Sequence, residues 1–423
     1  MAANIEPLPG TSDIWEPETL EWIELEQAAR DVFHRYGYGE IRTPIFERTE
    51  VFEKNLGEES DVVQKEMYTF QDRGGRSLTL RPEGTAGVIR AIANHGLDQG
   101  DERRVFYFGP MFRGERPAAG RRRQFHQIGV ESVGTNNPWM DVEVISMLVR
   151  FLDKIGLKDC HVNINTKGLP EDRQRVTTAL KEYFAPKIND MCEDCRRRLE
   201  TNVWRILDCK CEPCKTFAQD APKIIDLLSD TSRDYFNKVC EGLKQVGVDY
   251  EFAPRLVRGL DYYVHTVFEV THTGLGAQDA VAGGGRYQIA FPGMKNPIEG
   301  IGFAAGMERL LLARESLGMG VKEIRDADIM ILSLGEPAVL PGLQLAETLR
   351  QSFGNLRIKA DFTARSMKAQ MRGANKANAR LVLIRGENEL ADGTIGCKLM
   401  ETSEQVTVKL EELHDFIVSK LSI

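Results

Sequence analysis

With 423 residues, the chain is long enough for two to four domains of roughly 100–200 residues, and its 42% hydrophobic and 28% charged content is ordinary for a soluble globular protein. It has no apolar run near the ~18 residues of a membrane span, and residues 1–7 lack the basic and apolar regions of a signal peptide, so we expect a cytoplasmic protein. The net charge of −8 argues against a protein that coats nucleic acid without regard to sequence, but it is compatible with an enzyme that uses a polyanion.

The first part of the chain predicts an α+β fold. Apolar residues at helical spacing predict a helix over Leu20–Tyr36, and a strand with a proline follows over Ile41–Phe46, which favours an edge or interface position. Five further strands are predicted over residues 67–71, 77–80, 105–112, 124–131 and 162–165. Because no regular alternation with helices separates these strands, we expect an antiparallel sheet with helices interspersed.

The remainder of the chain changes character twice. Residues 168–250 are polar, mostly helical in pattern and cysteine-rich, so we interpret them as an insertion. Strand signals return over 256–270 and 300–303, followed by a helix from Met307 to about Leu317. From Asp326 onward, strands and helices alternate, which indicates a separate α/β domain. The expected domains are therefore 1–325, interrupted by 168–250, and 326–423.

The segment Phe112–Glu131 predicts a strand, a loop and a second strand. The loop carries four arginines, which are Arg116, Arg121, Arg122 and Arg123. Alternation along the second strand predicts one face made of Phe125, Gln127, Gly129 and Glu131. A ring, an amide and a carboxylate suit a pocket better than a core, and Arg113 on the first strand can hold a phosphate by two parallel hydrogen bonds. The alternative is a solvated hairpin with a basic tip.

Four further segments combine glycine or proline with polar or charged residues: 78–87, 256–269, 282–287 and 300–312. Glu83 and Thr85 come where a strand passes into a helix. Arg258 precedes Gly259, which lets the chain bend close to a ligand. Arg309 falls in the first turn of a helix, where the guanidinium and the helix end both attract anions. Alone, each feature also fits a helix cap, a core strand or a surface arginine.

Together these segments resemble the histidyl-tRNA synthetase family. The hairpin with Phe112–Glu115 and the corner Gly300–Arg309 are similar to motifs 2 and 3 of class II aminoacyl-tRNA synthetases, and Tyr36–Phe46 is similar to motif 1, the dimer element. The segments 256–269 and 282–287 resemble the two signatures of histidyl-tRNA synthetases, although family members more often continue with Asp-Gly after the position of Tyr287. The resemblance covers essentially the whole chain. It implies a class II antiparallel sheet, a helical insertion and a C-terminal α/β anticodon-binding domain.

The resemblance also implies the chemistry. The family joins L-histidine to ATP with Mg²⁺, without an organic cofactor, and transfers histidine to the 3′ end of tRNA(His) as a homodimer. By resemblance, Arg113 and Arg258 are catalytic, at the α-phosphate. Histidine binding is assigned to Glu83, Thr85, Arg113, Gln127, Glu131, Arg258, Tyr262 and Tyr263, with Glu131 and Tyr263 at the two imidazole nitrogens. ATP binding is assigned to Arg113, Glu115, Phe125 and Arg309, and contact with the tRNA acceptor end to Arg116, Arg121, Arg122 and Arg123.

The charge of the expected anticodon-binding domain supports this interpretation independently. Between Leu356 and Arg385, eight basic residues stand against one acid, Asp361, which gives this stretch a net charge of +7. The basic residues are Arg357, Lys359, Arg365, Lys368, Arg372, Lys376, Arg380 and Arg385. Contact with phosphates requires such local positive charge, whereas a merely solvated helix face usually mixes both signs.

Five of the eight cysteines lie close together in the expected insertion: Cys192, Cys195, Cys209, Cys211 and Cys214. Their spacing is compatible with a structural zinc. The alternative is reduced, unpaired thiols, and we favour it, with no metal site, because the family does not need zinc for catalysis.

Two rival functions are considered. Some bacteria carry a paralogue of histidyl-tRNA synthetase that senses histidine as a regulatory subunit of ATP phosphoribosyltransferase and charges nothing. Such paralogues generally lack the anticodon domain and the catalytic arginines, which are present here as Arg113, Arg258 and Arg309. A synthetase for another amino acid is opposed by the segment 256–269 and by the pairing of an acid with a tyrosine.

Overall fold

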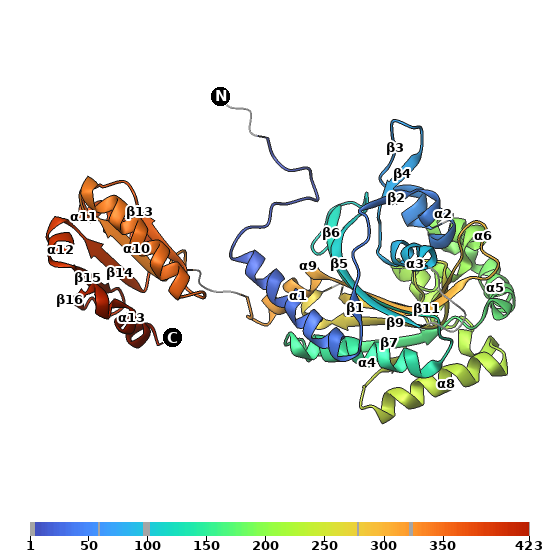
Figure 1. Cartoon of the computed structure of the whole chain (residues 1–423). Coiled ribbons are helices and arrows are strands. Elements are labelled where there is room, and N and C mark those ends of the chain that lie inside the picture. Colours follow the sequence, from blue (N-terminus) through green and yellow to red (C-terminus); the bar gives the residue numbers. More distant parts are fainter. Residues whose placement is uncertain (1–4, 58–59, 96–101, 277–278, 321–324, 423) are drawn as a thin grey trace. The chain divides into compact units, whose positions relative to one another are not determined.

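The computed structural model of the chain describes residues 5–57, 60–95, 102–276, 279–320 and 325–422 (Figure 1). The chain forms two compact units, residues 1–320 and 321–423. The division falls a few residues before the expected boundary at Asp326. Within the described residues, no helix has the length and apolar character that crossing a membrane requires.

A large sheet forms the framework of the first unit. Its strands lie in the order β1-β5-β6-β11-β10-β9-β7-β8, and all neighbours are antiparallel except β1 with β5 and β7 with β8. The strands are β1 (Gly39–Glu40), β5 (Arg103–Phe112), β6 (Gln124–Val133), β7 (Cys160–Thr166), β8 (Glu251–Phe252), β9 (Tyr263–His272), β10 (Ala280–Ile289) and β11 (Ile298–Gly306). The predicted antiparallel α+β class is confirmed.

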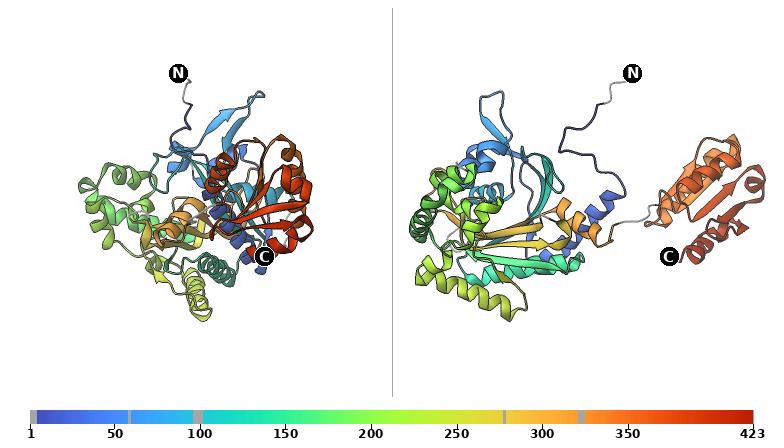
Figure 2. Two further views of the ribbon diagram at one scale, coloured as in Figure 1. Left: turned by 90° about the vertical axis from the view of Figure 1, so that its left-hand side faces the viewer. Right: turned by 180° about the vertical axis from the view of Figure 1, so that it is seen from behind.

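Helices cover one face of this sheet and form the main core with it (Figures 1 and 2). They are α1 (Glu18–Arg35), α4 (Pro138–Lys154), α8 (Asp230–Gln245) and α9 (Met307–Ser316). Helix α4 begins where the Asn137 side chain accepts the backbone N–H of Trp139 at 3.0 Å, with Pro138 in the first turn. Ile128 and Val130 of β6 point into this core, so the residues between them face the opposite side.

A smaller layer packs on that opposite side of the large sheet. It contains a three-stranded antiparallel sheet of β2 (Phe46–Arg48), β4 (Ser77–Leu80) and β3 (Thr69–Gln71), with α2 (Glu50–Leu56) and α3 (Thr85–Asn94). Phe52 and Ile89 of these helices share a second core with Tyr107, Tyr263 and Tyr287 of the large sheet. These three tyrosines therefore lie in the core between the smaller layer and the large sheet.

The expected insertion is mostly helical, but it divides between two cores. Helices α5 (Pro170–Phe184), α6 (Glu193–Thr201) and α7 (Glu212–Gln219) surround a core of their own. Helix α8, although expected within the same insertion, packs along α4 in the core of the large sheet. The separate helical core therefore ends before α8.

The second unit has a mixed five-stranded sheet. Parallel strands β13 (Ile358–Asp361), β12 (Ile329–Ser333) and β14 (Leu381–Arg385) are followed by antiparallel β15 (Thr394–Leu399) and β16 (Gln405–Lys409). The helices are α10 (Val339–Ser352), α11 (Met367–Lys376), α12 (Glu387–Asp392) and α13 (Leu413–Leu421). The predicted alternation of strands and helices is confirmed, and short helix α12 is an addition.

Two local predictions were wrong, and one strand departs from regular alternation. The segment Ile41–Phe46 lies mostly between β1 and β2 rather than in one strand, because Pro44 has no N–H to donate to a ladder. Strand β9 begins at Tyr263, so Arg258 lies on the approach to the strand. The pairing of β9 with β10 shifts at Gly285, where His265 has φ +46° and stacks on Tyr235 of α8 at 4.0 Å. His265 thus leaves the face that strict alternation from Tyr263 would give it.

Candidate active site

A cleft of about 250 Å³ opens over strands β6, β9, β10 and β11 and the start of α9. Eight residues assigned from the sequence line it: Arg113, Glu115, Arg121, Arg122, Phe125, Gln127, Arg258 and Arg309. They come from segments far apart in the chain and meet because the antiparallel order brings β6, β11 and β10 together. Phe125 and Gln127, two of the four residues of the predicted β6 face, therefore line a cavity.

Arg113 lies over the aromatic wall of the cleft. Its guanidinium carbon is 5.3 Å from the centre of the Phe125 ring, and its Nε donates to the backbone oxygen of Pro82 at 2.9 Å. Glu115 forms ion pairs with Arg113 at 3.8 Å and with Arg121 at 3.3 Å. These contacts hold the guanidinium at the mouth of the cleft while an edge of it still faces the cavity.

Arg258, on the approach to β9, also lines the cleft. Its Nη1 donates to Glu269 Oε2 at 2.8 Å, and both side chains are about three-quarters covered. A Cβ at Gly283 would come within 2.5 Å of Arg258 Nη1, so the guanidinium lies directly on the backbone of β10. Gly283 thus leaves Arg258 a space that any side chain at this position would occupy.

Two backbone carbonyl oxygens hold Arg309. Its Nε donates to Gly120 at 3.2 Å and its Nη1 to Ala280 at 2.5 Å. Burial lowers the pKa of its guanidinium, and nearby Arg121 adds to that effect. This corner of the cleft therefore concentrates positive charge at the first turn of α9, which suits a polyanion.

A second, buried group of side chains continues from the cleft. Glu83 Oε2 and Oε1 accept the backbone N–H groups of Thr85 at 2.7 Å and Ala86 at 2.8 Å, which caps the start of α3. The Thr85 hydroxyl donates to Glu131 Oε1 at 2.7 Å. Burial raises the pKa of Glu131 to about 8. Gln127 lies four residues before Glu131 in β6 and lines the cleft, so it links this group to the cleft.

Two buried acceptors in this group have no hydrogen-bond partner among the described residues. They are Gln127 Oε1 and Glu131 Oε2. Buried polar atoms in native proteins are nearly always satisfied, so the unpaired Gln127 Oε1, on a residue that lines the cleft, indicates a missing partner. An amide oxygen and a carboxyl group can together receive an ammonium and a ring N–H.

Tyr262 and Tyr263 lie in the same core cluster as Tyr107 and line a separate cavity of about 200 Å³. Their ring centres are 4.6 Å apart, and Tyr262 also meets the Tyr287 ring edge-on at 5.8 Å. Burial raises the pKa of both phenols, so they stay neutral and can donate or accept.

Tyr107 and Glu308 were missed by the sequence analysis. A Cβ at Gly84 or at Gly129 would meet the Tyr107 ring at 2.2–2.3 Å, so this ring fills the space between two glycines beside Glu131. Glu308 accepts the backbone N–H of His126 at 3.0 Å and ties α9 to β6. Gly129 stands between larger residues in its strand. Such a glycine was the sequence feature that could have indicated a bulky group, here the Tyr107 ring, packed against the strand.

The remaining predicted residues lie on the loop of the hairpin. Arg116 is exposed, and Arg123 donates to the backbone oxygen of Glu115 at 3.4 Å. Arg122 contacts the Ser12 hydroxyl, and the backbone of Arg123 donates to Gly10 at 2.9 Å. The N-terminal segment therefore holds the outer end of the hairpin, where Arg116 is free to reach outward.

Comparisons with known proteins agree with this geometry. Residues 10–310 match the family model of histidyl-tRNA synthetase, and residues 328–420 match that of the anticodon-binding domain. A histidine–tRNA ligase from Oleidesulfovibrio alaskensis is 48% identical over 412 residues, which are 97% of this chain and 98% of that protein. The crystal structure of apo S. aureus histidyl-tRNA synthetase is 35% identical, with a TM-score of 0.78 over 97% of this chain and 99% of that one.

A regulatory relative shares the fold. The structure described as an ATP phosphoribosyltransferase regulatory subunit/histidyl-tRNA synthetase from Bacillus halodurans has a TM-score of 0.64 over 90% of this chain and 98% of its own. At 20% identity, this likeness extends to the fold alone. The family model and the close relatives decide the assignment, and the chain belongs to the histidyl-tRNA synthetase family.

Proposed function

We propose that this chain, as a histidine–tRNA ligase, activates L-histidine with ATP in the cleft and then transfers histidine to the 3′ end of tRNA(His) in the cytoplasm. One observation carries the proposal. Arg113, Arg258 and Gln127 line the same cavity, and Gln127 Oε1 has no hydrogen-bond partner among the described residues. A carboxylate held between two guanidinium groups and next to an α-phosphate is the arrangement that adenylate formation requires.

The buried group of side chains beside the cleft binds the imidazole and the ammonium of histidine. Gln127 Oε1 accepts from the ammonium, with Glu83 and Thr85 adjacent. Glu131 Oε2 and the Tyr263 hydroxyl pair with the two imidazole nitrogens, one of which donates and one of which accepts. Tyr262 packs beside them. The unpaired Gln127 Oε1, on a residue that lines the cleft, supports its role.

The cleft binds ATP. Phe125 stacks on the adenine, and Glu115 accepts from its amino group. Arg113 and Arg258 neutralise the α-phosphate as the histidine carboxylate attacks it in line and pyrophosphate leaves, while Arg309 holds the γ-phosphate. The family implies Mg²⁺, and the Glu269 carboxylate on the cleft wall is the kind of oxygen that Mg²⁺ takes beside phosphates. When bound, the ion would share the negative charge of the triphosphate.

Two surfaces serve tRNA. Arg116 and Arg121–Arg123, at the outer end of the hairpin, bind phosphates of the acceptor end. The second unit binds the anticodon, and its basic residues favour contact with the backbone. Phe362 is 54% exposed directly after β13, and an aromatic ring in that setting suits stacking on a base.

The enzyme works as a homodimer. Phe46 and Phe70, on neighbouring parts of the three-stranded sheet, are 53% and 44% exposed with ring centres 6.4 Å apart. Ile45, 43% exposed, extends the same apolar surface. A second copy would cover these rings, in keeping with the resemblance of this region to the dimer element of class II synthetases.

Pyrophosphate exchange with a panel of amino acids tests the proposed reaction. We expect exchange that depends on histidine, and charging of tRNA(His) by the same preparation. Exchange with another amino acid instead of histidine would contradict the assignment. Histidine binding by calorimetry without any exchange would favour the regulatory alternative.

A further inference from the structure

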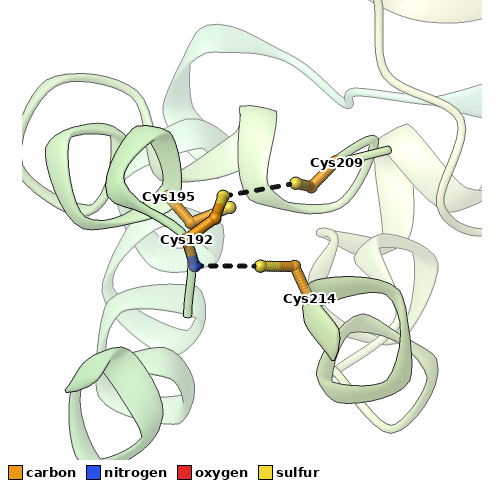
Figure 3. A group of neighbouring side chains, drawn as sticks. All are labelled: Cys192, Cys195, Cys209 and Cys214. Atoms are coloured by element: carbon orange, nitrogen blue, oxygen red, sulfur yellow. Dashed lines mark hydrogen bonds between the residues drawn. The ribbon is translucent and has the colours of Figure 1, made fainter. Parts of the chain in front are cut away.

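Four cysteines of the helical insertion meet at one point. Cys192 and Cys195 lie at the start of α6, Cys209 follows the short helical turn Val203–Ile206, and Cys214 lies in the first turn of α7 (Figure 3). Their Sγ atoms all lie within 4.8 Å of one another. The fifth cysteine of this region, Cys211, is outside the group.

We propose that Cys192, Cys195, Cys209 and Cys214 bind one zinc ion that holds the insertion together. Zinc bound by four thiolates is tetrahedral, and Zn–S bonds of about 2.3 Å place the sulfur atoms about 3.8 Å apart. The Sγ atoms of Cys192 and Cys209 are 3.8 Å apart already. The proposal replaces the interpretation of unpaired thiols that we favoured from the sequence.

The surroundings of the sulfur atoms match a structural site. Cys195, Cys209 and Cys214 are buried in the core of the insertion, and Cys192 is partly exposed, which gives an ion access. The backbone N–H of Cys192 points to Cys214 Sγ at 3.3 Å (Figure 3), and such donors stabilise a bound thiolate. Four protein ligands leave no open position for substrate, so the site is structural and not catalytic.

The thiolate ligands determine which metal the site prefers. Thiolates favour zinc or iron over Mg²⁺ or Ca²⁺. A cluster with several irons would place metal and sulfide between the cysteines and so hold them further apart than a single ion does. The compact group therefore favours one ion, and zinc is the metal most often bound by four cysteines in a structural role.

The ion would compensate for a small core. Helices α6 and α7 are nine and eight residues long, too short to be stable alone, and three of the cysteines supply part of the core between them. Small cores of this kind commonly need a metal or a disulfide, and all eight cysteines here are free. Zinc binding would thus contribute directly to the free energy of folding of the insertion.

The insertion also supports the loop that carries Arg258. Val257 is buried in the same core as the cysteines. Asn202, in the stretch between the two cysteine pairs, donates from Nδ2 to Asp261 Oδ1 at 3.2 Å. These contacts connect the zinc site to both sides of Arg258, so loss of the ion would loosen the catalytic loop as well as the insertion.

Metal analysis of the full-length protein tests the proposal. We expect about one zinc per chain after purification without chelators, and retention of zinc by Cys211→Ser. Cys192→Ser and Cys214→Ser should lose it. Absence of zinc, failure to take up added Zn²⁺ under reducing conditions, or iron in its place would overturn the proposal, as would equal zinc in the three variants.

Alkylation of the unmodified protein gives a second measurement, which does not depend on whether the variants fold. Cys192 and Cys211 are both partly exposed, so they form a matched pair. With zinc bound, Cys192 should react slowly, and a chelator should raise its rate at least tenfold while Cys211 changes little. Equal rates for Cys192 with and without the chelator, or a disulfide that involves it, would contradict a thiolate–zinc site.

Discussion

Arg258 Nη1 lies 2.8 Å from Glu269 Oε2 and directly above the backbone of Gly283. The Glu269 carboxylate and the absence of a side chain at Gly283 together determine the position of the Arg258 guanidinium. Positioning of this kind matters because a displacement of about 1 Å at a reacting centre can cost about 10²-fold in rate.

Gly283→Ala is therefore expected to lower kcat/KM for pyrophosphate exchange about 100-fold without unfolding the protein. The new Cβ would come within 2.5 Å of Arg258 Nη1, and the guanidinium can move aside while the strand stays in place. Gly354→Ala is a control, because a Cβ there meets nothing within 4 Å. Equal exchange rates for Gly283→Ala and the unmodified enzyme would show that Arg258 does not act from this position.

Phe125→Ala is expected to raise the KM for ATP about tenfold or more, because stacking of an aromatic ring on a base contributes about 1–3 kcal/mol. Phe125→Tyr keeps the ring and should keep the KM. The change also removes the ring below Arg113, so kcat should fall together with ATP binding. A KM for histidine that rises while the KM for ATP does not would place the adenine elsewhere. Steady-state exchange with each substrate varied in turn measures both constants.

Glu131 should make the free enzyme less stable as the pH rises. Burial raises its pKa from 4.5 to about 8, so between these values the native state holds a proton that the unfolded state releases. The associated stability is complete below pH 4.5 and is lost as the pH approaches 8. Each pKa unit corresponds to about 1.4 kcal/mol, so the loss amounts to a few kcal/mol.

Glu131→Gln removes this titration and should give a flatter dependence of the free energy of unfolding on pH between 5 and 9, measured by urea denaturation without ligands. The same variant should bind histidine much more weakly, because an amide replaces the carboxyl at the imidazole. Parallel curves for the variant and the unmodified protein would mean that Glu131 is ionised in the native state near neutral pH.

The sequence predicted the residues that line the cleft better than the buried group of side chains beside it. Alternation along Gln124–Val133 placed Phe125 and Gln127 correctly, because a strand with one buried face has a strict period of two. The shift at Gly285 could not be predicted from that period, and it moved His265 to the helix-covered side. Tyr107 was missed since its place depends on Gly84 and Gly129, which are distant in sequence and create space only in the folded chain.

The cysteines show a similar limit. Their spacing was compatible with zinc and equally with free thiols, since spacing alone does not say whether two pairs converge. The folds of α6 and α7 bring Cys192, Cys195, Cys209 and Cys214 together and leave out Cys211. The choice between the two interpretations therefore depends on tertiary structure, which the sequence pattern does not contain.

Helix α11 carries three exposed cations on one face. Lys368, Arg372 and Lys376 are spaced by four residues, and the structure gives them no ion pair within its described residues. Replacing all three by alanine should weaken tRNA binding and flatten its dependence on salt. Each lost phosphate contact lowers the slope of log K against log salt by about 0.7–0.9, so three contacts lower it by roughly 2–3.

Exchange of pyrophosphate should be unchanged in this triple variant, because the cleft is built wholly from the first unit. Lys409→Ala is a control, since Lys409 is also exposed but pairs with Glu411 at 3.7 Å. Charging assays with tRNA varied at several salt concentrations measure the effect. A triple variant with an unchanged KM for tRNA and an unchanged salt slope would assign anticodon contact to another face of the second unit, because loss of three phosphate contacts cannot leave an electrostatic slope intact.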